Sequence, residues 1–253
     1  MTFRCDGLTV DWFGYATVRI ETDGGFVAYL DPGRYGVLTG EWTPDTGGVG
    51  HPPGRDYRSE DADLVCVTHD HHYDSDGIER VAAEGATVVA YEAVDADRSD
   101  RDVAPLSELP YGVERVAYGD ELSVGPAEVR ATPAYNRPDG PHTRGDGTPY
   151  HPEGFGCGFR LGFDGADSGA SAFWPGDSDV LDAHREVDAS LLLPPIGGSF
   201  TMDRRGAADL AVAVGPGLVC PIHYNTFAAL EADGRAFAAD VAGRGVPVVL
   251  DEE

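Results

Sequence analysis

A short apolar strand that ends in a cluster of metal-ligand side chains constrains this chain more than any other stretch. Residues 64–67 read LVCV, which is typical of a buried strand. Residues 69–76 then read HDHHYDSD, and residues 77–83 carry a helical apolar spacing. The cluster therefore falls at the carboxyl end of a strand, just before a helix, where α/β folds usually place their sites.

Similar side chains stand beside three other predicted strands. Asp177 and His223 each follow a strand, and His151 precedes one. Imidazole and carboxylate are ligands of zinc and related metals, and two bridged metals would supply a nucleophile and a Lewis acid. A plainer interpretation exists for each residue, since a carboxylate such as that of Asp177 also forms Asx turns. A histidine that stands alone in the sequence more often has a structural or surface role than a ligand role. We apply this interpretation to His51, His142 and His184.

The order of the predicted elements favours two sheets. Strands are predicted at 8–13, 16–21, 26–30, 64–67, 86–91, 113–118, 121–124, 128–132, 155–163, 171–175, 189–194, 218–222 and 246–250. A helix is predicted over 204–214, with Asp203 as its cap. Each half has strands first and then alternating strand and helix, an order that two sheets packed face to face with helices outside would satisfy. The Gly/Pro-rich segments 36–60 and 133–154 are expected to be long loops that decide the substrate.

The charge of the chain excludes two classes of partner. The net charge is −26, and all 18 basic residues are arginine. Nucleic acid and anionic membranes both require a basic footprint, so we expect neither as a partner. A dense carboxylate shell without lysine indicates an acidic protein of halophilic type, kept soluble in high salt.

The remaining composition favours a cytoplasmic protein. Its 253 residues fit one domain over 1–253, and because residues 1–6 lack the basic and apolar regions of a signal peptide, we expect neither a signal peptide nor a membrane span. Its four cysteines form no CxxC pair, which favours reduced thiols. The composition leaves the oligomeric state open, and a homo-oligomer is compatible with it.

Four motifs together resemble the metallo-β-lactamase superfamily. They are THDH at 68–71, Gly176-Asp177, PIGGSFTMD at 195–203 and PIHYNTF at 221–227. The resemblance is greatest to the branch of small metal-dependent hydrolases related to ascorbate-6-phosphate lactonase. It begins at 12–18, where the family usually has a tryptophan, glycine, histidine, alanine run and this chain reads WFGYATV. The resemblance implies a four-layer αββα sandwich of two mixed β-sheets flanked by helices.

The resemblance also implies a ligand set. The family pattern after the strand is His-x-His-x-Asp-His, and an ungapped alignment gives His69 and His71 to the first site, completed by His151. Tyr73 then stands at the aspartate position and Asp74 at the third histidine, whereas a shifted alignment would lose both outer histidines. On the ungapped alignment Asp177 bridges, and Asp74 with His223 forms the second site. One or two Zn²⁺ ions are expected, with Mn²⁺ or Fe²⁺ as alternatives, because tyrosine is a poor ligand.

The function implied is that of a metal-dependent hydrolase. Metal-bound hydroxide would attack an ester, lactone or phosphodiester bond of a small-molecule substrate, with Asp74 at the metal. Hydrogen bonds to the developing oxyanion are expected from Tyr73, Tyr224 and Asn225. Two alternatives are a non-hydrolytic metal-binding module with a degenerate second metal site and a nuclease of the same superfamily, the latter opposed by the charge.

Overall fold

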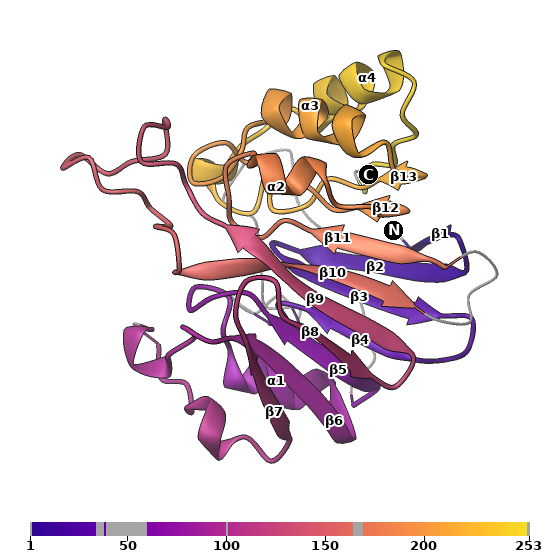
Figure 1. The fold of residues 1–253 in the computed structure, drawn as a ribbon, viewed down its shortest axis with the longest axis vertical. Coiled ribbons are helices and arrows are strands. Elements are labelled where there is room, and N and C mark those ends of the chain that lie inside the picture. The colour runs from indigo at the N-terminus through magenta and orange to yellow at the C-terminus, as the bar shows by residue number, and fades with distance from the viewer. Residues whose placement is uncertain (1, 34–37, 39–59, 100, 164–168, 252–253) are drawn as a thin grey trace.

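Two mixed β-sheets form the centre of the molecule (Figure 1). The structure is a computed structural model that describes residues 2–33, 38, 60–99, 101–163 and 169–251. The first sheet contains, in spatial order, β1 (Thr2–Cys5), β2 (Leu8–Gly14), β3 (Thr17–Thr22), β4 (Val27–Leu30), β5 (Ala62–Val67), β6 (Ala82–Tyr91) and β7 (Gly112–Val116). Strands β1 to β4 pair antiparallel, and β4 to β7 pair parallel.

The second sheet repeats this mixture of directions. Its order is β13 (Leu218–Val219), β12 (Leu191–Leu192), β11 (Ser171–Trp174), β10 (Gly156–Phe163), β9 (Ala127–Ala134) and β8 (Glu121–Val124). Strands β11, β12 and β13 pair parallel, and the others pair antiparallel. Buried apolar side chains from both sheets belong to one continuous core.

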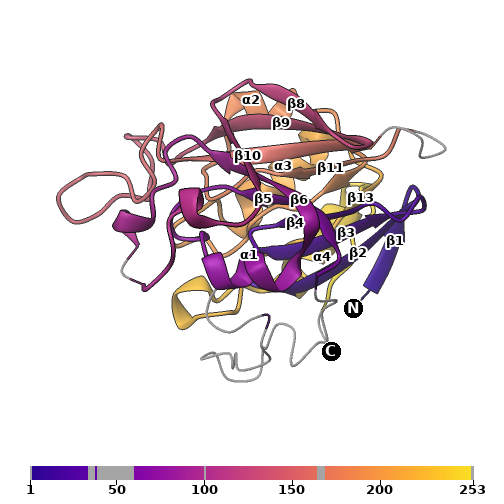
Figure 2. The ribbon, with the colours of Figure 1, turned by 90° about the horizontal axis from the view of Figure 1, so that it is seen from below.

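Helices flank the two sheets. Helix α1 (Ser75–Val81) lies beside β5 and β6 in both views (Figures 1 and 2). Helices α2 (Asp182–Arg185), α3 (Arg204–Val214) and α4 (Gly234–Gly243) lie beside the second sheet, with α3 packed on both α2 and α4. Short 3₁₀ helices in the described part of the chain include Ala96–Arg98, Leu106–Glu108 and Ala228–Leu230. The predicted class, two mixed sheets flanked by helices, is thus confirmed.

Several predicted elements occur at their expected positions. Helix α3 spans the predicted residues, and the Asp203 carboxylate accepts hydrogen bonds from the backbone N–H groups of Arg205 and Gly206. The segment between β9 and β10 is a long loop that projects from the body of the molecule (Figures 1 and 2). The predicted loop at 36–60 lies outside the described residues except for its members 38 and 60.

Other predictions were inaccurate at the level of single elements. Strand β1 was not predicted, and α1 ends at Val81 because β6 begins four residues earlier than expected. The expected strand 246–250 contributes one isolated bridge, from Val248 to Val219. No helix in the described part of the chain is long and apolar enough to cross a membrane.

A buried arginine lies on the first sheet. The side chain of Arg19, on β3, is 2% exposed and contacts carboxylates of Asp61 at 2.8 Å, Glu21 at 2.9 Å and Asp11 at 3.8 Å. Burial opposes its charge, but hydrogen bonds to Asp61 and Glu21 more than offset that cost and hold the pKa of the guanidinium above its usual value. Arg19 therefore neutralises a cluster of carboxylates on this sheet.

A buried histidine in α2 is neutral for a structural reason. The Nδ1 atom of His184 accepts a hydrogen bond from the backbone N–H of Leu181, and Nε2–H donates to the carbonyl of Pro133 at 2.7 Å. Burial lowers the pKa of His184 to about 4. A protonated ring would lose its acceptor at Nδ1, so the fold depends on the neutral form.

We expect His184 to make the protein sensitive to mild acid. Its pKa is about 6.5 in the unfolded chain and about 4 in the fold, so between these values only the unfolded chain binds the proton. The free energy of unfolding should therefore fall as the pH is lowered from 6.5 to 4, by about 3 kcal/mol from this residue. His184→Gln keeps a donor for Pro133 without titrating. Urea unfolding of both chelator-treated proteins at pH 7 and pH 4.5 should show the smaller loss in the variant, and equal losses would contradict the assignment.

Candidate metal centre

The ends of strands from both sheets place acidic and histidine side chains close together. Asp31 follows β4, His69 and His72 follow the adjacent parallel strand β5, and Asp177 follows β11. His223 follows β13 after three further residues. Because parallel neighbours present their carboxyl ends at the same edge, these residues converge on one region.

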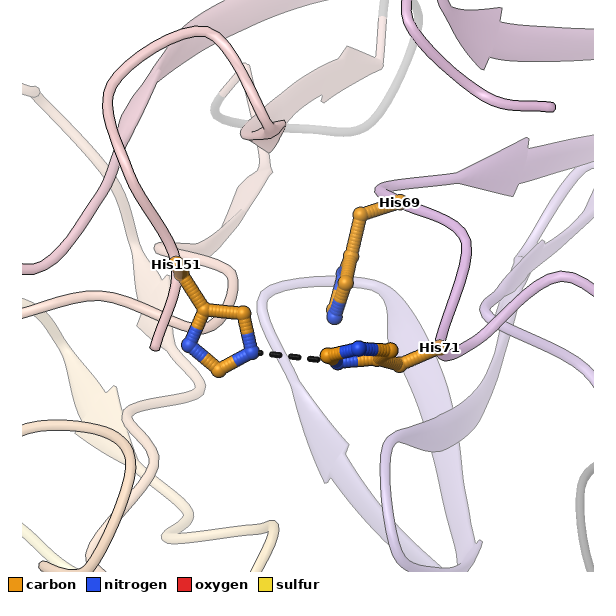
Figure 3. Close-up of side chains that lie close together, drawn as sticks. All are labelled: His69, His71 and His151. Carbon is orange, nitrogen blue, oxygen red and sulfur yellow. Dashed lines mark hydrogen bonds between the residues drawn. The ribbon is translucent and has the colours of Figure 1, made fainter. Parts of the chain in front are cut away.

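Three histidines form the first group of candidate ligands, which we call the first histidine group: His69, His71 and His151. Their ring nitrogens lie within 4.8 Å of one another, and Nδ1 of His71 is 3.2 Å from Nε2 of His151. Figure 3 shows the three rings turned toward a common point, two from the turn after β5 and one from the loop before β10. Three imidazoles in this arrangement can ligate one divalent cation.

Two more histidines form the second histidine group, His72 and His223. Their Nε2 atoms are 3.3 Å apart. His72 also belongs, with His69 and Asp177, to a set of ligand atoms within 4.8 Å of one another. The second group therefore lies directly beside the first.

The carboxylate of Asp177 lies between the two groups. Its Oδ2 atom is 3.6 Å from Nε2 of His69 and 3.5 Å from Nε2 of His151. Its Oδ1 atom is 3.3 Å from Nε2 of His223 and 3.8 Å from Nε2 of His72. Each oxygen thus faces one histidine group, which is the geometry of a bridging ligand.

Two glycines and a strained turn allow this convergence. A Cβ at Gly156 would lie 2.7 Å from Cβ of His69, so glycine lets β10 pack against that ligand. Gly176, just before Asp177, has φ of 70°, and a Cβ there would lie 2.4 Å from the carbonyl oxygen of Cys157. His223 has φ of 58°, and its N–H donates to the carbonyl of Tyr15 at 2.9 Å. Left-handed backbone at a residue other than glycine often marks a functional site.

A buried carboxylate orients His72. Asp31 lies 3.0 Å from Nδ1 of His72 and accepts hydrogen bonds from Nε1–H of Trp174 at 2.9 Å and from the N–H of Thr68 at 2.8 Å. Burial raises the pKa of Asp31 to about 7 against these hydrogen bonds. A carboxylate on one ring nitrogen leaves the other facing the metal position, which is the usual support of a metal-binding histidine.

A second network supports His151. Oδ1 of Asn136 accepts from the backbone N–H of His151 at 2.9 Å and lies 3.2 Å from its Nδ1. The amide of Asn136 in turn donates to Asp179, which pairs with His142. Both nitrogens of His142 face acceptors, Asp179 and the carbonyl of Gly198, and the hydrogen bond to Asp179 raises the pKa of the ring. His142 and His184 thus lie outside the histidine groups, and His51 is not among the described residues.

The donor set fits a divalent metal. Burial, helped by the nearby His71, lowers the pKa of His151 to about 3, so its ring is neutral and can offer a lone pair. Neutral imidazoles and one bridging carboxylate suit zinc, and also iron or manganese. The structure thus brings together five of the residues predicted from the sequence, which are His69, His71, His151, Asp177 and His223.

The structure corrects the expectation for Asp74 and Tyr73. The Asp74 carboxylate caps α1 by accepting from Gly77 N–H at 3.1 Å and pairs with Arg101 at 3.4 Å. The Tyr73 hydroxyl donates to the carbonyl of Ala104 at 2.5 Å. The reason is a turn: the N–H of His72 donates to the carbonyl of His69 at 3.1 Å, so the alternation of a strand stops. His72 returns beside His69, with ring centroids 4.2 Å apart, and takes the position predicted for Asp74.

Two further predicted side chains have structural partners. The amide of Asn225 donates to the carbonyl of Ala232 at 3.1 Å and accepts from its N–H at 2.9 Å. The ring of Tyr224 is fully buried and stacks on Trp12 at 5.3 Å. The Asn225 amide is thus occupied by Ala232, and neither Tyr224 nor Asn225 is among the residues that line the pocket beside the ligands.

Sequence reasoning missed the roles of His72 and Asp31. His72 was recognised as a ligand type, but the alignment gave its role to Asp74. Asp31 was not among the candidate residues, although it directly follows the apolar strand predicted at 26–30. Its signal was an acidic residue directly after an apolar strand, the same signal that identified Asp177.

A pocket of about 220 Å³ opens onto the ligands. Its wall includes His71, His151, Asp177 and His223. The rest of the wall is aromatic or aliphatic: Tyr15, Tyr150, Phe200, Phe227 and Leu230. A small molecule can therefore reach both histidine groups at once.

Known proteins resemble this chain in sequence over most of its length, and others resemble it in fold. A "UPF0173 metal-dependent hydrolase" of Methanosphaerula palustris is 31% identical over 184 residues, which cover 70% of this chain and 75% of the relative. Another, from Methanopyrus kandleri, is 28% identical over 248 residues, covering 95% and 94%. The metallo-β-lactamase fold protein YhfI of Bacillus subtilis superposes with a TM-score of 0.60 at 13% identity, covering 94% of this chain and 90% of its own. Together with the histidine groups, these likenesses define a metal-dependent hydrolase.

The family follows from a match over most of the chain. Residues 9–223 match the Beta-lactamase superfamily domain. The matched range includes both histidine groups, Asp31 and Asp177. The chain belongs to this superfamily, as the sequence motifs predicted.

Proposed function

We propose that the protein hydrolyses an ester, lactone or phosphodiester bond of a small molecule at a centre that holds two divalent cations. One observation carries the proposal: each carboxylate oxygen of Asp177 faces a different histidine group. A carboxylate between two groups of imidazoles would allow two divalent cations to be bound side by side, as two-metal hydrolases require. We propose Zn²⁺, with Mn²⁺ or Fe²⁺ as alternatives.

The protein's own residues supply position and shape. His69, His71 and His151 would hold the first cation, and His72 with His223 would hold the second. A divalent cation bound by these residues would lower the pKa of water and polarise the oxygen of the bond to be cleaved. Asp31 fixes the orientation of His72, and Asn136 fixes that of His151. The apolar wall of the pocket keeps bulk water from the substrate.

We propose a setting for this activity. The net charge of −26 without lysine supports an acidic, halophilic protein that acts in the cytoplasm as one domain, alone or as a homo-oligomer, and binds neither nucleic acid nor membranes. Screening by concentrated salt relieves the repulsion between its carboxylates. Activity and thermal midpoint that are highest in dilute buffer, and fall in molar KCl, would contradict this setting.

Removal of metal is expected to abolish turnover. The experiment measures bound metal by mass spectrometry and hydrolysis of δ-valerolactone, p-nitrophenyl acetate and bis-p-nitrophenyl phosphate, before and after dialysis against a chelator. We expect about two cations per chain, loss of all turnover with the metal, and recovery on adding Zn²⁺, Mn²⁺ or Fe²⁺. Turnover that survives metal removal would refute the proposed mechanism. A fully loaded protein without turnover on any substrate would favour the alternative of a metal-binding module.

A further inference from the structure

We propose that the pocket selects a compact, uncharged ester or lactone that carries a planar apolar group. This inference rests on the proposed hydrolysis and deepens it, because it concerns the part of the substrate that lies away from the reacting bond. It depends on two observations, the aromatic lining of the pocket and the absence of arginine and lysine from that lining in the described part of the chain.

Two aromatic pairs line the pocket. Tyr15 and Phe227 meet edge to face with centroids 5.4 Å apart, and Tyr150 and Phe200 do so at 4.9 Å. Aromatic rings favour contact with other planar apolar groups. Because both pairs share the wall with the histidines, a planar group between them would sit beside the bond presented to the metal centre.

The Tyr15 ring is fixed over the second histidine group. Its centroid is 4.5 Å from that of His223 and 4.9 Å from that of His72. Its backbone has φ of 50°, and its carbonyl accepts from both His223 N–H and Trp12 Nε1–H. The wall is therefore preorganised, which reduces the entropy lost when a substrate binds.

Among the described residues, the side chains that line the pocket offer no positive charge to the part of a substrate away from the metal centre. Among the residues that line it in the described part of the chain, Asp177 is the acidic one and none is arginine. The nearby Arg144 is exposed, and its guanidinium lies 5.6 Å from the centre of the Tyr150 ring, outside the lining. The chain has no lysine at all. A negative group on the substrate away from the reacting bond would thus lose its hydration without gaining a partner.

The size of the pocket also favours a compact substrate. A cavity of about 220 Å³ is smaller than the sites that hold drug-sized ligands, which start near 300 Å³. It suits one ring fused to or bearing the reacting ester. The overall charge of −26 further lowers the local concentration of anions near the entrance.

Two matched pairs of substrates test the two halves of the inference with the metal-loaded protein. Dihydrocoumarin and δ-valerolactone share a six-membered lactone and differ by a benzene ring. 3-Carbamoylphenyl acetate and 3-carboxyphenyl acetate share size and reacting bond and differ by one charge. Each kcat/KM is divided by the rate constant for hydrolysis of the same substrate by hydroxide alone, which corrects for intrinsic reactivity. We expect this corrected value to be about tenfold higher for dihydrocoumarin than for δ-valerolactone, and about tenfold higher for the carbamoyl ester than for the carboxyl ester.

Variants connect these preferences to the lining. Tyr150→Ala and Phe227→Ala should each lower the dihydrocoumarin to δ-valerolactone ratio by about tenfold. Tyr150→Arg should raise turnover of the carboxyl ester relative to the carbamoyl ester. Tyr111→Ala, a half-buried tyrosine outside the pocket, is the matched control and should change neither ratio.

The outcomes separate this inference from the proposed function. Faster turnover of the carboxyl ester, or a lactone ratio that the pocket variants leave unchanged, would overturn the inference while hydrolysis stands. If the loaded protein turns over no substrate, the proposed function fails, and calorimetric binding of coumarin then decides the inference. Binding that weakens about tenfold in Tyr150→Ala supports it, and equal or undetectable binding in the native protein and this variant overturns it.

Discussion

Replacing His72 with alanine is expected to remove one of two bound cations and to lower kcat/KM by a factor on the order of 10³. The reason is that His72 lies 3.3 Å from His223 and 3.8 Å from Asp177, so the second histidine group would retain one imidazole. A cation in such a site contributes several kcal/mol of charge stabilisation in the transition state, and each 1.4 kcal/mol is a factor of ten in rate. Metal analysis and steady-state kinetics measure the two effects.

Asp74→Asn is the matched comparison for His72→Ala. The ungapped alignment makes Asp74 the ligand, whereas the structure gives its carboxylate to the N-terminus of α1. We expect this variant to keep both cations, most of its activity and most of its stability, because asparagine caps a helix about as well as aspartate. If Asp74→Asn loses a cation and His72→Ala keeps both, the alignment is right and the turn after His69 is misassigned.

Replacing Arg19 with methionine is expected to destabilise the fold by about 3–5 kcal/mol. The substitution keeps a similar volume but leaves the carboxylates of Asp61, Glu21 and Asp11 facing one another without their shared cation. The loss arises from uncompensated, partly buried charge, so it should shrink in molar salt. Urea unfolding followed by circular dichroism, in dilute buffer and in concentrated KCl, measures it.

An exposed arginine provides the control for Arg19. Arg4 pairs with Asp23 where both side chains are more than 60% exposed, 64% and 63% respectively. Such surface pairs contribute about 1 kcal/mol or less, so Arg4→Met should change stability little. Equal losses from the two variants would show that Arg19 acts through the total charge of the chain and not through its buried partners.

The sequence was sufficient to predict the parts of the site that lie at strand ends. Asp177, His223 and the pair His69 and His71 each stand next to an apolar run, and a strand end has a predictable direction. The helix over Arg204–Val214 was equally predictable, because an aspartate cap and a regular apolar spacing are both local signals. These features depend on neighbours in sequence.

What the sequence did not reveal depends on turns and long-range contacts. The alternation of a strand predicts that residues 69, 71 and 73 share a face, but the chain turns at His69 and brings His72 back instead. The role of Asp31 requires knowing that β4 and β5 are adjacent and parallel, although a long segment separates them in sequence. The Asp74 carboxylate could either cap a helix or bind a metal, and the position at which α1 begins determines that it caps the helix.

In the segment between β9 and β10, consecutive residues belong to the pocket wall and to the candidate metal site. Tyr150 forms part of the pocket wall, and His151 is a candidate ligand in the first histidine group. His142 lies in this segment and anchors it to the body of the protein, because its ring forms hydrogen bonds with the Asp179 carboxylate and the carbonyl of Gly198. Shifting this backbone to enlarge the pocket would therefore displace a ligand. Natural divergence or laboratory redesign toward bulkier substrates should proceed by trimming individual side chains at 150, 200 and 227, and insertions next to His151 should abolish activity before they broaden it.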